Sequence, residues 1–362
     1  MKQNYLKLMM LCLFFITGMS TYAYDCEVDG IYYDLNTTNH TANVTYAPLG
    51  GSYSGIVNIP EYIEYNGVTY TIVSIGDYAF SNCNGLTELT IGNSVTSIGM
   101  SALFYCSGLA KLTIGNSVTS IGDNAFQYCS GLTELTFPNS VTSIGGYAFD
   151  GCRGLTELTI PSSVSSIGTN AFRNWSLEKI MVEEGNPYYD SREDCNGIIR
   201  TENNELILGC QNTHIPNSVT SIGRYAFQGC RGLTELTIPN SVTSIGLLAF
   251  NACTSLLSVT SLNLLPPTAP LGFELVCFDD ETYQNATLHV PAGCKEAYQQ
   301  AECWKNFLNI QDDAVTGIES VKADKQGKTA IYTLDGKRLQ TTNVADLPTG
   351  IYIVNGKKVV VK

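Results

Sequence analysis

Cysteines and histidines are the residues of this 362-residue chain best suited to nucleophilic or metal chemistry. The chain has 13 cysteines, and six of them recur at one position of a repeated sequence: Cys83, Cys106, Cys129, Cys152, Cys230 and Cys253. A buried free thiol behaves as a small hydrophobic group and is inert as a nucleophile. We therefore expect a column of reduced, structural thiols at this position, and no cofactor.

The remaining candidates for catalysis do not form a recognisable motif. The three histidines, His40, His214 and His289, lie far apart in the sequence, and no CxxC, HExxH, Walker, GxSxG or GxGxxG pattern occurs. Neighbouring acids such as Asp279 and Asp280 match no calcium-binding loop. We predict that the protein is not an enzyme and has no catalytic, cofactor-binding or metal-binding residues.

Two further cysteines suggest a covalent link. Cys195 and Cys210 lie symmetrically about Glu202 and Asn203, the centre of an expected hairpin from Gly197 to Gly209. Antiparallel pairing would place them opposite each other, and an exported protein can oxidise such a pair. A Cys195–Cys210 disulfide is therefore a hypothesis, with two free thiols as the alternative.

An internal repeat must position all of these side chains. The sequence Ser-Val-Thr-Ser-Ile-Gly begins at residues 94, 117, 140, 218 and 241, with variants at 71 and 163. The consensus unit continues with Ala-Phe-x-x-Cys and then Leu-x-x-Leu-x-Ile, and a repeat of this length and leucine spacing is typical of a leucine-rich repeat. We expect a stack of coils of about 23 residues, each with a long strand in a parallel sheet, a second short strand and a helical turn.

These motifs resemble the BspA-like leucine-rich repeat family, known mainly from surface and secreted proteins of Bacteroidetes and some mucosal parasites. The resemblance covers about residues 26–312. It implies a mainly β solenoid with short helical turns, and a non-enzymatic role in adhesion to, or binding of, host or bacterial proteins. The alternative is a glycan-binding or accessory module for polysaccharide capture.

Both ends of the chain indicate export. Lys2 and Lys7 precede a short apolar run, and Thr21-Tyr22-Ala23 fits a signal-peptidase site. No apolar run in the chain is long enough for a membrane span. Alternating residues with Asp-Gly and Asn-Gly turns predict a small β domain at 313–362. This tail is similar to a short C-terminal sorting domain of type IX secretion, which implies a secreted protein or one on the exterior of the outer membrane.

The expected organisation follows from these patterns. It comprises a signal peptide at 1–23, an N-terminal cap at 24–70, a solenoid at 71–262 with an insertion at 183–216, a C-terminal cap at 263–312 and the β domain at 313–362. The formal net charge is −13, and the acidic excess lies in 24–312 while the tail is mildly basic. An acidic chain lacks the electrostatic footprint of a nucleic-acid-binding protein, so we expect extracellular proteins or glycans as partners.

Two surfaces are candidates for recognition. Outward positions of the long strands form the first, which we call the strand-face column: Glu88, Lys111, Glu134, Glu157, Lys179 and Glu235. The lysines relieve repulsion between stacked glutamates, so the column is either a stabilising device or a shallow polar binding face. Variable positions of the helical turns form the second: Tyr78, Tyr105, Tyr128, Tyr147 and Tyr225. Exposed tyrosines favour protein interfaces, and the alternative is that these positions are merely unconstrained.

Overall fold

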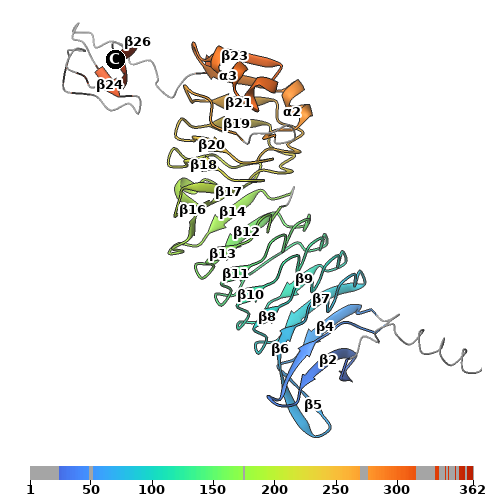
Figure 1. Cartoon of the computed structure of the whole chain (residues 1–362). Coiled ribbons are helices and arrows are strands. Elements are labelled where there is room, and N and C mark those ends of the chain that lie inside the picture. Colours follow the sequence, from blue (N-terminus) through green and yellow to red (C-terminus); the bar gives the residue numbers. More distant parts are fainter. Residues whose placement is uncertain are drawn as a thin grey trace, which may run out of the picture.

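Stacked coils between two caps make up most of the chain (Figure 1). The computed structural model describes residues 24–48, 52–173, 176–269 and 276–314, together with 331–333, 339, 341, 347, 350–354 and 357–361 of the tail. The predicted signal peptide lies outside the described residues. The architecture is the predicted leucine-rich repeat solenoid, mainly β with short turns.

Mixed strand pairing builds the N-terminal end of the solenoid. Its strands are β1 (Cys26–Val28), β2 (Ile31–Asn36), β3 (Thr41–Val44), β4 (Gly55–Ile59), β5 (Tyr62–Tyr65) and β6 (Val68–Ile75). β1, β2 and β3 pair antiparallel, whereas β3 pairs parallel with β6 and β4 pairs parallel with β7 (Leu86–Ile91). The antiparallel strands therefore cover the apolar end of the first coil and then join its parallel sheets.

Short strands run along one side of the coils in strict register. They are β8 (Ser97–Ile98), β10 (Ser120–Ile121), β11 (Ser143–Ile144), β13 (Ser166–Ile167), β18 (Ser221–Ile222) and β20 (Ser244–Ile245). Each Ser lies opposite Ser and each Ile opposite Ile in the next coil. The identical repeats fix this register, because a slip would turn the buried isoleucines towards solvent.

Long strands form the second parallel surface, and it is divided. Besides β7 these are β9 (Lys111–Thr113), β12 (Glu157–Ile160), β14 (Lys179–Val182), β19 (Glu235–Ile238) and β21 (Ser258–Ser261). They belong to three separate sheets. The coil with Leu132 and Phe137 forms no regular strand between β9 and β12, and the insertion lies between β14 and β19. Phe137 replaces the usual isoleucine, and its ring packs edge-on against Phe149 at a centroid distance of 5.5 Å.

Phenylalanines from the helical turns stack through the core. The rings of Phe126 and Phe149 lie 4.9 Å apart and nearly parallel, and those of Phe149 and Phe172 lie 5.5 Å apart. Beyond the insertion, Phe227 and Phe250 stack at 5.1 Å. These separations match the spacing of neighbouring coils, about 4.8 Å. The core nevertheless falls into two clusters that divide at the insertion.

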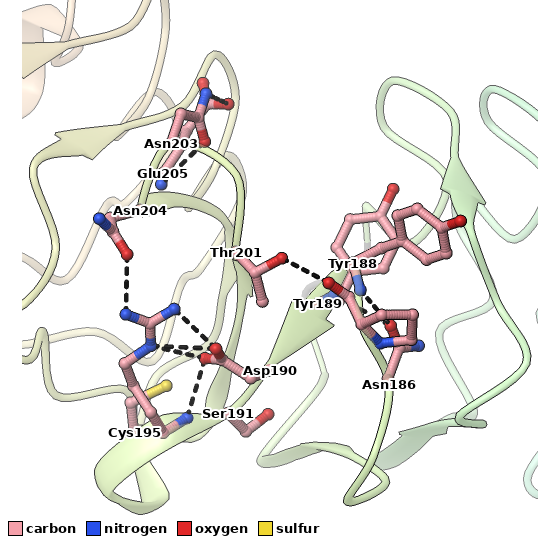
Figure 2. A network of polar contacts seen from close by, with 12 residues as sticks. Asn186, Tyr188, Tyr189, Asp190, Ser191, Cys195, Thr201, Asn203, Asn204 and Glu205 are labelled. Carbon is pink, nitrogen blue, oxygen red and sulfur yellow. Dashed lines mark hydrogen bonds and ion pairs between the residues drawn. The ribbon is translucent and has the colours of Figure 1, made fainter.

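The insertion adds its own hairpin to the solenoid. It contains β15 (Tyr189–Asp190), the short 3-10 helix η1 (Arg192–Asp194), β16 (Gly197–Arg200) and β17 (Glu205–Gly209). The predicted hairpin is confirmed, and β17 continues into the coils by pairing parallel with β18. Figure 2 shows the turn that leads into β15: the amide oxygen of Asn186 accepts hydrogen bonds from the backbone N–H groups of Tyr188 and Tyr189 at 2.8 and 3.0 Å.

Helices and strands close the C-terminal end. They are α2 (Asp280–Asn285), β22 (Thr287–Pro291), α3 (Lys295–Gln300), η2 (Trp304–Asn306) and β23 (Asn309–Ala314). The carboxylate of Asp279 caps α2 by accepting the N–H of Thr282, and buried Trp304 donates its indole N–H to the Pro267 carbonyl. In the tail, β24 (Ile331–Thr333), β25 (Gly350–Val354) and β26 (Lys357–Val361) pair antiparallel, as expected for a small β domain.

Candidate protein-binding surfaces

The strand-face column contains two of the expected ion pairs. Glu88 lies opposite Lys111 across β7 and β9, with 3.6 Å between the ammonium nitrogen and the carboxylate oxygen. Glu157 and Lys179 lie opposite each other across β12 and β14 at 3.5 Å. Exposed pairs of this kind contribute between zero and about 1 kcal/mol. Each lysine therefore offsets the glutamate before it in the stack at little gain in stability.

Two other members of the strand-face column stand apart from these pairs. Glu134 lies in the coil that forms no regular long strand, and Glu235 lies opposite Ser258 in a separate sheet. The column is therefore not one continuous face. It contains two local charge pairs and two separate glutamates.

The five tyrosines form two groups rather than one. Tyr78, Tyr147 and Tyr225 begin the helical turns of their coils, whereas Tyr105 and Tyr128 precede Cys106 and Cys129 of the cysteine column. Tyr105 and Tyr128 contact each other, with ring centroids 5.9 Å apart. The ring of Phe104 packs against both of them at 6.1 and 5.9 Å. We call Phe104, Tyr105 and Tyr128 the aromatic cluster.

All five tyrosines have a left-handed backbone conformation, which the sequence did not reveal. Their φ angles lie between 55° and 63°. Equivalent positions of other coils have the same conformation. Some hold Asn124, Asn170 and Gly151, which tolerate it well, but others hold Ser101, Leu248 and Ala252. The conformation is therefore a property of the repeat position, and the case for a use of the tyrosines depends on what their rings contact.

A small pocket opens beside the aromatic cluster. Its volume is about 130 Å³, and it is lined by Tyr128, Asp150, Gly151, Arg153 and Arg173. Gly151 is required here, because a Cβ atom at this position would lie 2.5 Å from the Tyr128 ring and its φ is +75°. Aromatic rings, an arginine and a recess thus adjoin on the helical-turn side, which is the composition typical of an interface anchor.

A buried carboxylate organises the floor of this pocket. Asp150 is 1% exposed and accepts hydrogen bonds from Arg173 Nε at 2.6 Å, Arg173 Nη2 at 2.9 Å and Gln127 Nε2 at 2.8 Å. The Asp150 carboxylate in turn raises the pKa of the Arg173 guanidinium. A buried charge requires this kind of pairing to be tolerated at all.

These contacts belong to a polar ladder with one side chain from each coil. Arg173 Nη1 continues it by donating to Gln228 Oε1 at 3.4 Å, and Gln228 Nε2 donates to Asn251 Oδ1 at 3.3 Å. This ladder was not predicted from the sequence. The available signal was an aspartate and an arginine at the same repeat position in successive coils, Asp150 and Arg173.

The repeated cysteines form the expected column of buried free thiols. After Cys83, which donates within its own coil, the thiols donate to carbonyls of the preceding layer. The Sγ–O distances include 2.9 Å from Cys106 to Phe80, 3.2 Å from Cys129 to Leu103 and 3.1 Å from Cys253 to Phe227. Burial raises the pKa of Cys152 to about 12. The column is structural, since a protonated, inaccessible thiol is not a nucleophile.

Cys195 and Cys210 are not opposite each other, and the structure does not join them. Both are buried free thiols. The hairpin pairs Gly197 with Gly209, which places Asn196 rather than Cys195 opposite Cys210. The Asn196 amide accordingly donates to the Cys210 sulfur at 3.3 Å, while Cys195 packs in the other core cluster. The expected geometry was wrong by one residue of register.

Neither metal ligands nor a membrane-spanning helix is found in the described part of the chain. No group of three or more His, Cys, Asp or Glu side chains gathers there in a way that would hold a metal ion. None of its helices has the length and apolar content needed to cross a bilayer.

Comparisons with known proteins address the fold and the family. The model of the family described as "BspA type Leucine rich repeat region" matches in six copies, over residues 62–187 and 206–266, which is just over half of the chain. No curated protein matches the chain.

One solved structure supports the fold, and two others are similar at lower TM-scores. A leucine-rich repeat protein from Bacteroides ovatus superposes with a TM-score of 0.50 at 24% identity, covering 76% of this chain and 81% of that one. One from Eubacterium ventriosum gives a TM-score of 0.48 at 24% identity, with coverage of 74% and 77%. A leucine-rich cell surface protein from Faecalibacterium prausnitzii gives 0.44 at 24%, with coverage of 80% and 95%. With its repeats matched over more than half of its length, the chain belongs to the BspA-type leucine-rich repeat family.

Proposed function

We propose that this chain is a non-enzymatic binding protein of the cell exterior, secreted or held at the surface, that adheres to host or bacterial proteins. The observation that carries the proposal is the aromatic cluster of Phe104, Tyr105 and Tyr128. Tyr105 is 47% exposed although its backbone conformation disfavours a tyrosine. Exposed aromatic rings beside a recess are characteristic anchors of protein interfaces.

The solenoid suits this use for a general reason. Stacked coils present an extended surface whose stacking residues are fixed and whose exposed residues vary freely. Here the turns vary while the short strands repeat almost unchanged, so recognition is expected on the helical-turn side. The strand-face column, in which two glutamates already pair with lysines, serves mainly to balance charge.

Substitutions taken from the repeat itself provide the test. The variant with Tyr105→Asn and Tyr128→Gly places at both positions residues that equivalent coils carry, Asn82 and Gly151, so its fold is expected to persist. Wild type and variant are applied to an array of immobilised extracellular matrix proteins and purified glycans. The expected result is binding of wild type to a protein, and at least about tenfold weaker binding of the variant.

A variant of the strand face controls for non-specific charge effects. Lys111→Gln removes an exposed pair without touching the aromatic cluster, and its binding should equal that of wild type. Binding to glycans with none to any protein would contradict the proposal and favour the polysaccharide-capture alternative. An unchanged affinity of the tyrosine variant would exclude the aromatic cluster as the anchor.

The proposal includes the route to the cell exterior. Residues 1–23 are proposed as a signal peptide, and 313–362 as a short type IX sorting domain, in keeping with their sequence patterns. Deleting 313–362 should leave the protein in the periplasm, as measured by protease accessibility and fractionation. Unchanged surface display would reject the sorting role of the tail.

A further inference from the structure

A second recess, the junction cleft, lies where the insertion interrupts the coils. It has a volume of about 170 Å³ and opens between the helical turns 168–173 and 223–228, with Ile207, Leu208 and Gly209 of β17 among its lining residues. Arg173 lines both this cleft and the pocket beside the aromatic cluster.

The cleft exists because a strand replaces one helical turn. β17 takes the place of a coil: Leu206 pairs with Ile222, the N–H of Gly209 donates to the Ala226 carbonyl, and the Cys230 thiol donates to the Gly209 carbonyl. Leu206 and Gly209 occupy the positions that Ile75 and Phe80 occupy in an ordinary coil. Phe80 follows Ile75 by five positions, but Gly209 follows Leu206 by only three. The shortened segment runs straight and does not bulge outward, which leaves the space of the missing turn open.

The missing turn leaves one wall of the cleft with unused backbone donors. In the preceding coil, the N–H groups of Tyr147 and Phe149 donate to the carbonyls of Thr169 and Ala171 at 3.0 and 2.7 Å. The equivalent N–H groups of the next coil are those of Asn170 and Phe172. Among the residues that the structure describes, no acceptor meets them.

The opposite wall has backbone carbonyls that lack donors among the described residues. Arg224 and Gln228 occupy the positions whose carbonyls accept hydrogen bonds from the preceding turn in ordinary coils, as Thr169 does from Tyr147. Within the described ranges, neither of these two carbonyls has a donor. The cleft is thus bounded by donors on one side and acceptors on the other, which is the polarity that a polypeptide backbone satisfies.

Charge at the cleft favours an acidic occupant. All six arginines of residues 24–312 lie between Arg153 and Arg231, within an otherwise acidic body. Of the three that line the cleft, Arg173 pairs with Asp150 and Arg200 pairs with Glu205. Exposed Arg224 meets no described carboxylate: its guanidinium lies 4.6 Å from the Tyr225 ring centroid and donates to the Tyr225 hydroxyl at 2.6 Å.

We infer that the junction cleft binds an acidic peptide segment of a partner protein. The backbone of the segment completes the interrupted hydrogen-bond ladder between Asn170 and Arg224, and its carboxylate pairs with the Arg224 guanidinium. A sugar acid would supply the charge but not the alternating backbone donors and acceptors. The inference rests on the proposed function as a protein-binding module and assigns the partner's chemistry at a second site.

Peptide probes of matched sequence test the inference on the full chain. One probe is a pool of acetylated, amidated heptapeptides with random residues around a central aspartate, and the other has asparagine in its place. The readouts are the amide resonances of Asn170 and Phe172 and the Nε–H resonance of Arg224. The aspartate pool is expected to shift all three, and the asparagine pool to bind about tenfold more weakly.

Two arginine variants separate a specific site from general attraction. Arg224→Gln should weaken binding of the aspartate pool about tenfold, whereas Arg231→Gln, a change outside the cleft lining, should leave it unchanged. Equal binding of both pools, or shifts that avoid Asn170 and Phe172, would overturn the inference. Shifts produced by glucuronic acid but by neither pool would overturn the peptide as the occupant.

This outcome can be told apart from that of the proposed function. The variant with Tyr105→Asn and Tyr128→Gly leaves the junction cleft intact, so the aspartate pool should still shift its resonances. Loss of matrix-protein binding in that variant with retained peptide binding supports both sites separately. Matrix-protein binding without any shift at the cleft overturns this inference alone.

Discussion

Arg173 clamps the Asp150 carboxylate of the coil before it through two hydrogen bonds, from Nε at 2.6 Å and Nη2 at 2.9 Å. The side chain of Asp150 is almost fully buried, whereas Arg173 is partly exposed. Arg173 also reaches Gln228 across the insertion. A single arginine thus neutralises a buried charge and connects the two parts of the solenoid.

Removing this arginine is expected to cost much more stability than removing an exposed lysine. Arg173→Leu leaves the Asp150 carboxylate buried without its counter-ion, a change worth about 3–5 kcal/mol. Lys179→Gln breaks the exposed pair with Glu157 and should cost less than about 1 kcal/mol. Urea unfolding of both variants measures the difference. If both variants lose the same stability, the buried pair does not have the role assigned here.

Replacing a left-handed tyrosine should stabilise the chain where the ring makes few contacts. Tyr78 is 48% exposed and has a φ of 59°. Tyr78→Asn relieves the unfavourable conformation, which costs roughly 1 kcal/mol for an ordinary side chain, and should raise the thermal midpoint. Tyr78→Val places a β-branched residue in the same conformation and should lower it. A lower midpoint for the asparagine variant would show that the Tyr78 ring contributes packing that outweighs the backbone cost.

Much of the solenoid could be predicted from the sequence, because identical repeats stack in register. The spacing alone placed Glu88 beside Lys111 and Glu157 beside Lys179, and both pairs form. The buried cysteine column followed from the same argument. The coil with Glu134 departed from it: it holds Phe137 in place of the isoleucine and forms no regular long strand.

The features that periodicity does not encode were missed. Whether Cys195 lies opposite Cys210 depends on the hairpin register. That register is set by a bulge between Ile198 and Ile199, which the residue types do not predict. The junction cleft depends on the segment from Leu206 to Gly209 being two residues shorter than the equivalent segment from Ile75 to Phe80. Only the clustering of arginines near the insertion gave a sequence signal for it.

Alkaline solution should destabilise the folded chain through its buried thiols. Burial raises the pKa of Cys152 and of Cys253 from the ordinary value of 9.0 to about 12. Between these values the unfolded chain loses thiol protons that the folded chain keeps. The stability is therefore fully present below about pH 9 and falls as the pH rises, by about 1 kcal/mol per thiol per pH unit.

Urea unfolding between about pH 8 and pH 9.5 checks this dependence, because most tyrosines remain protonated there. Cys152→Ala removes one titrating thiol, so its stability should be lower at neutral pH but fall less steeply above about pH 9. Parallel slopes for the variant and wild type would mean that Cys152 does not titrate with the unfolding of the chain.

Cys277 and Cys303 of the C-terminal cap should form a disulfide under mild oxidation. Their sulfur atoms lie 3.1 Å apart, and both residues are buried. The Cys277 thiol donates a hydrogen bond to Cys303 and lowers the pKa of Cys303 below its ordinary value. When local opening of the cap exposes the buried pair, Cys303 is therefore the sulfur that attacks first. Its thiolate displaces one glutathione from oxidised glutathione, and Cys277, once deprotonated, displaces the second. The two thiols are oxidised as one glutathione disulfide is reduced to two thiols.

Peptide mapping without reduction detects the disulfide, and two cysteines of the repeated column provide the matched control. Cys230 and Cys253 also belong to neighbouring layers, but each donates to a backbone carbonyl, so they should stay free under the same treatment. Closing a loop between residues 26 positions apart should stabilise the cap by about 3 kcal/mol, and a reductant should abolish this gain. Recovery of Cys277 and Cys303 as separately alkylated thiols after oxidation would disprove the pairing. Linkage of Cys230 to Cys253 instead would show that proximity alone, without the acidic Cys303 thiol, decides which cysteines react.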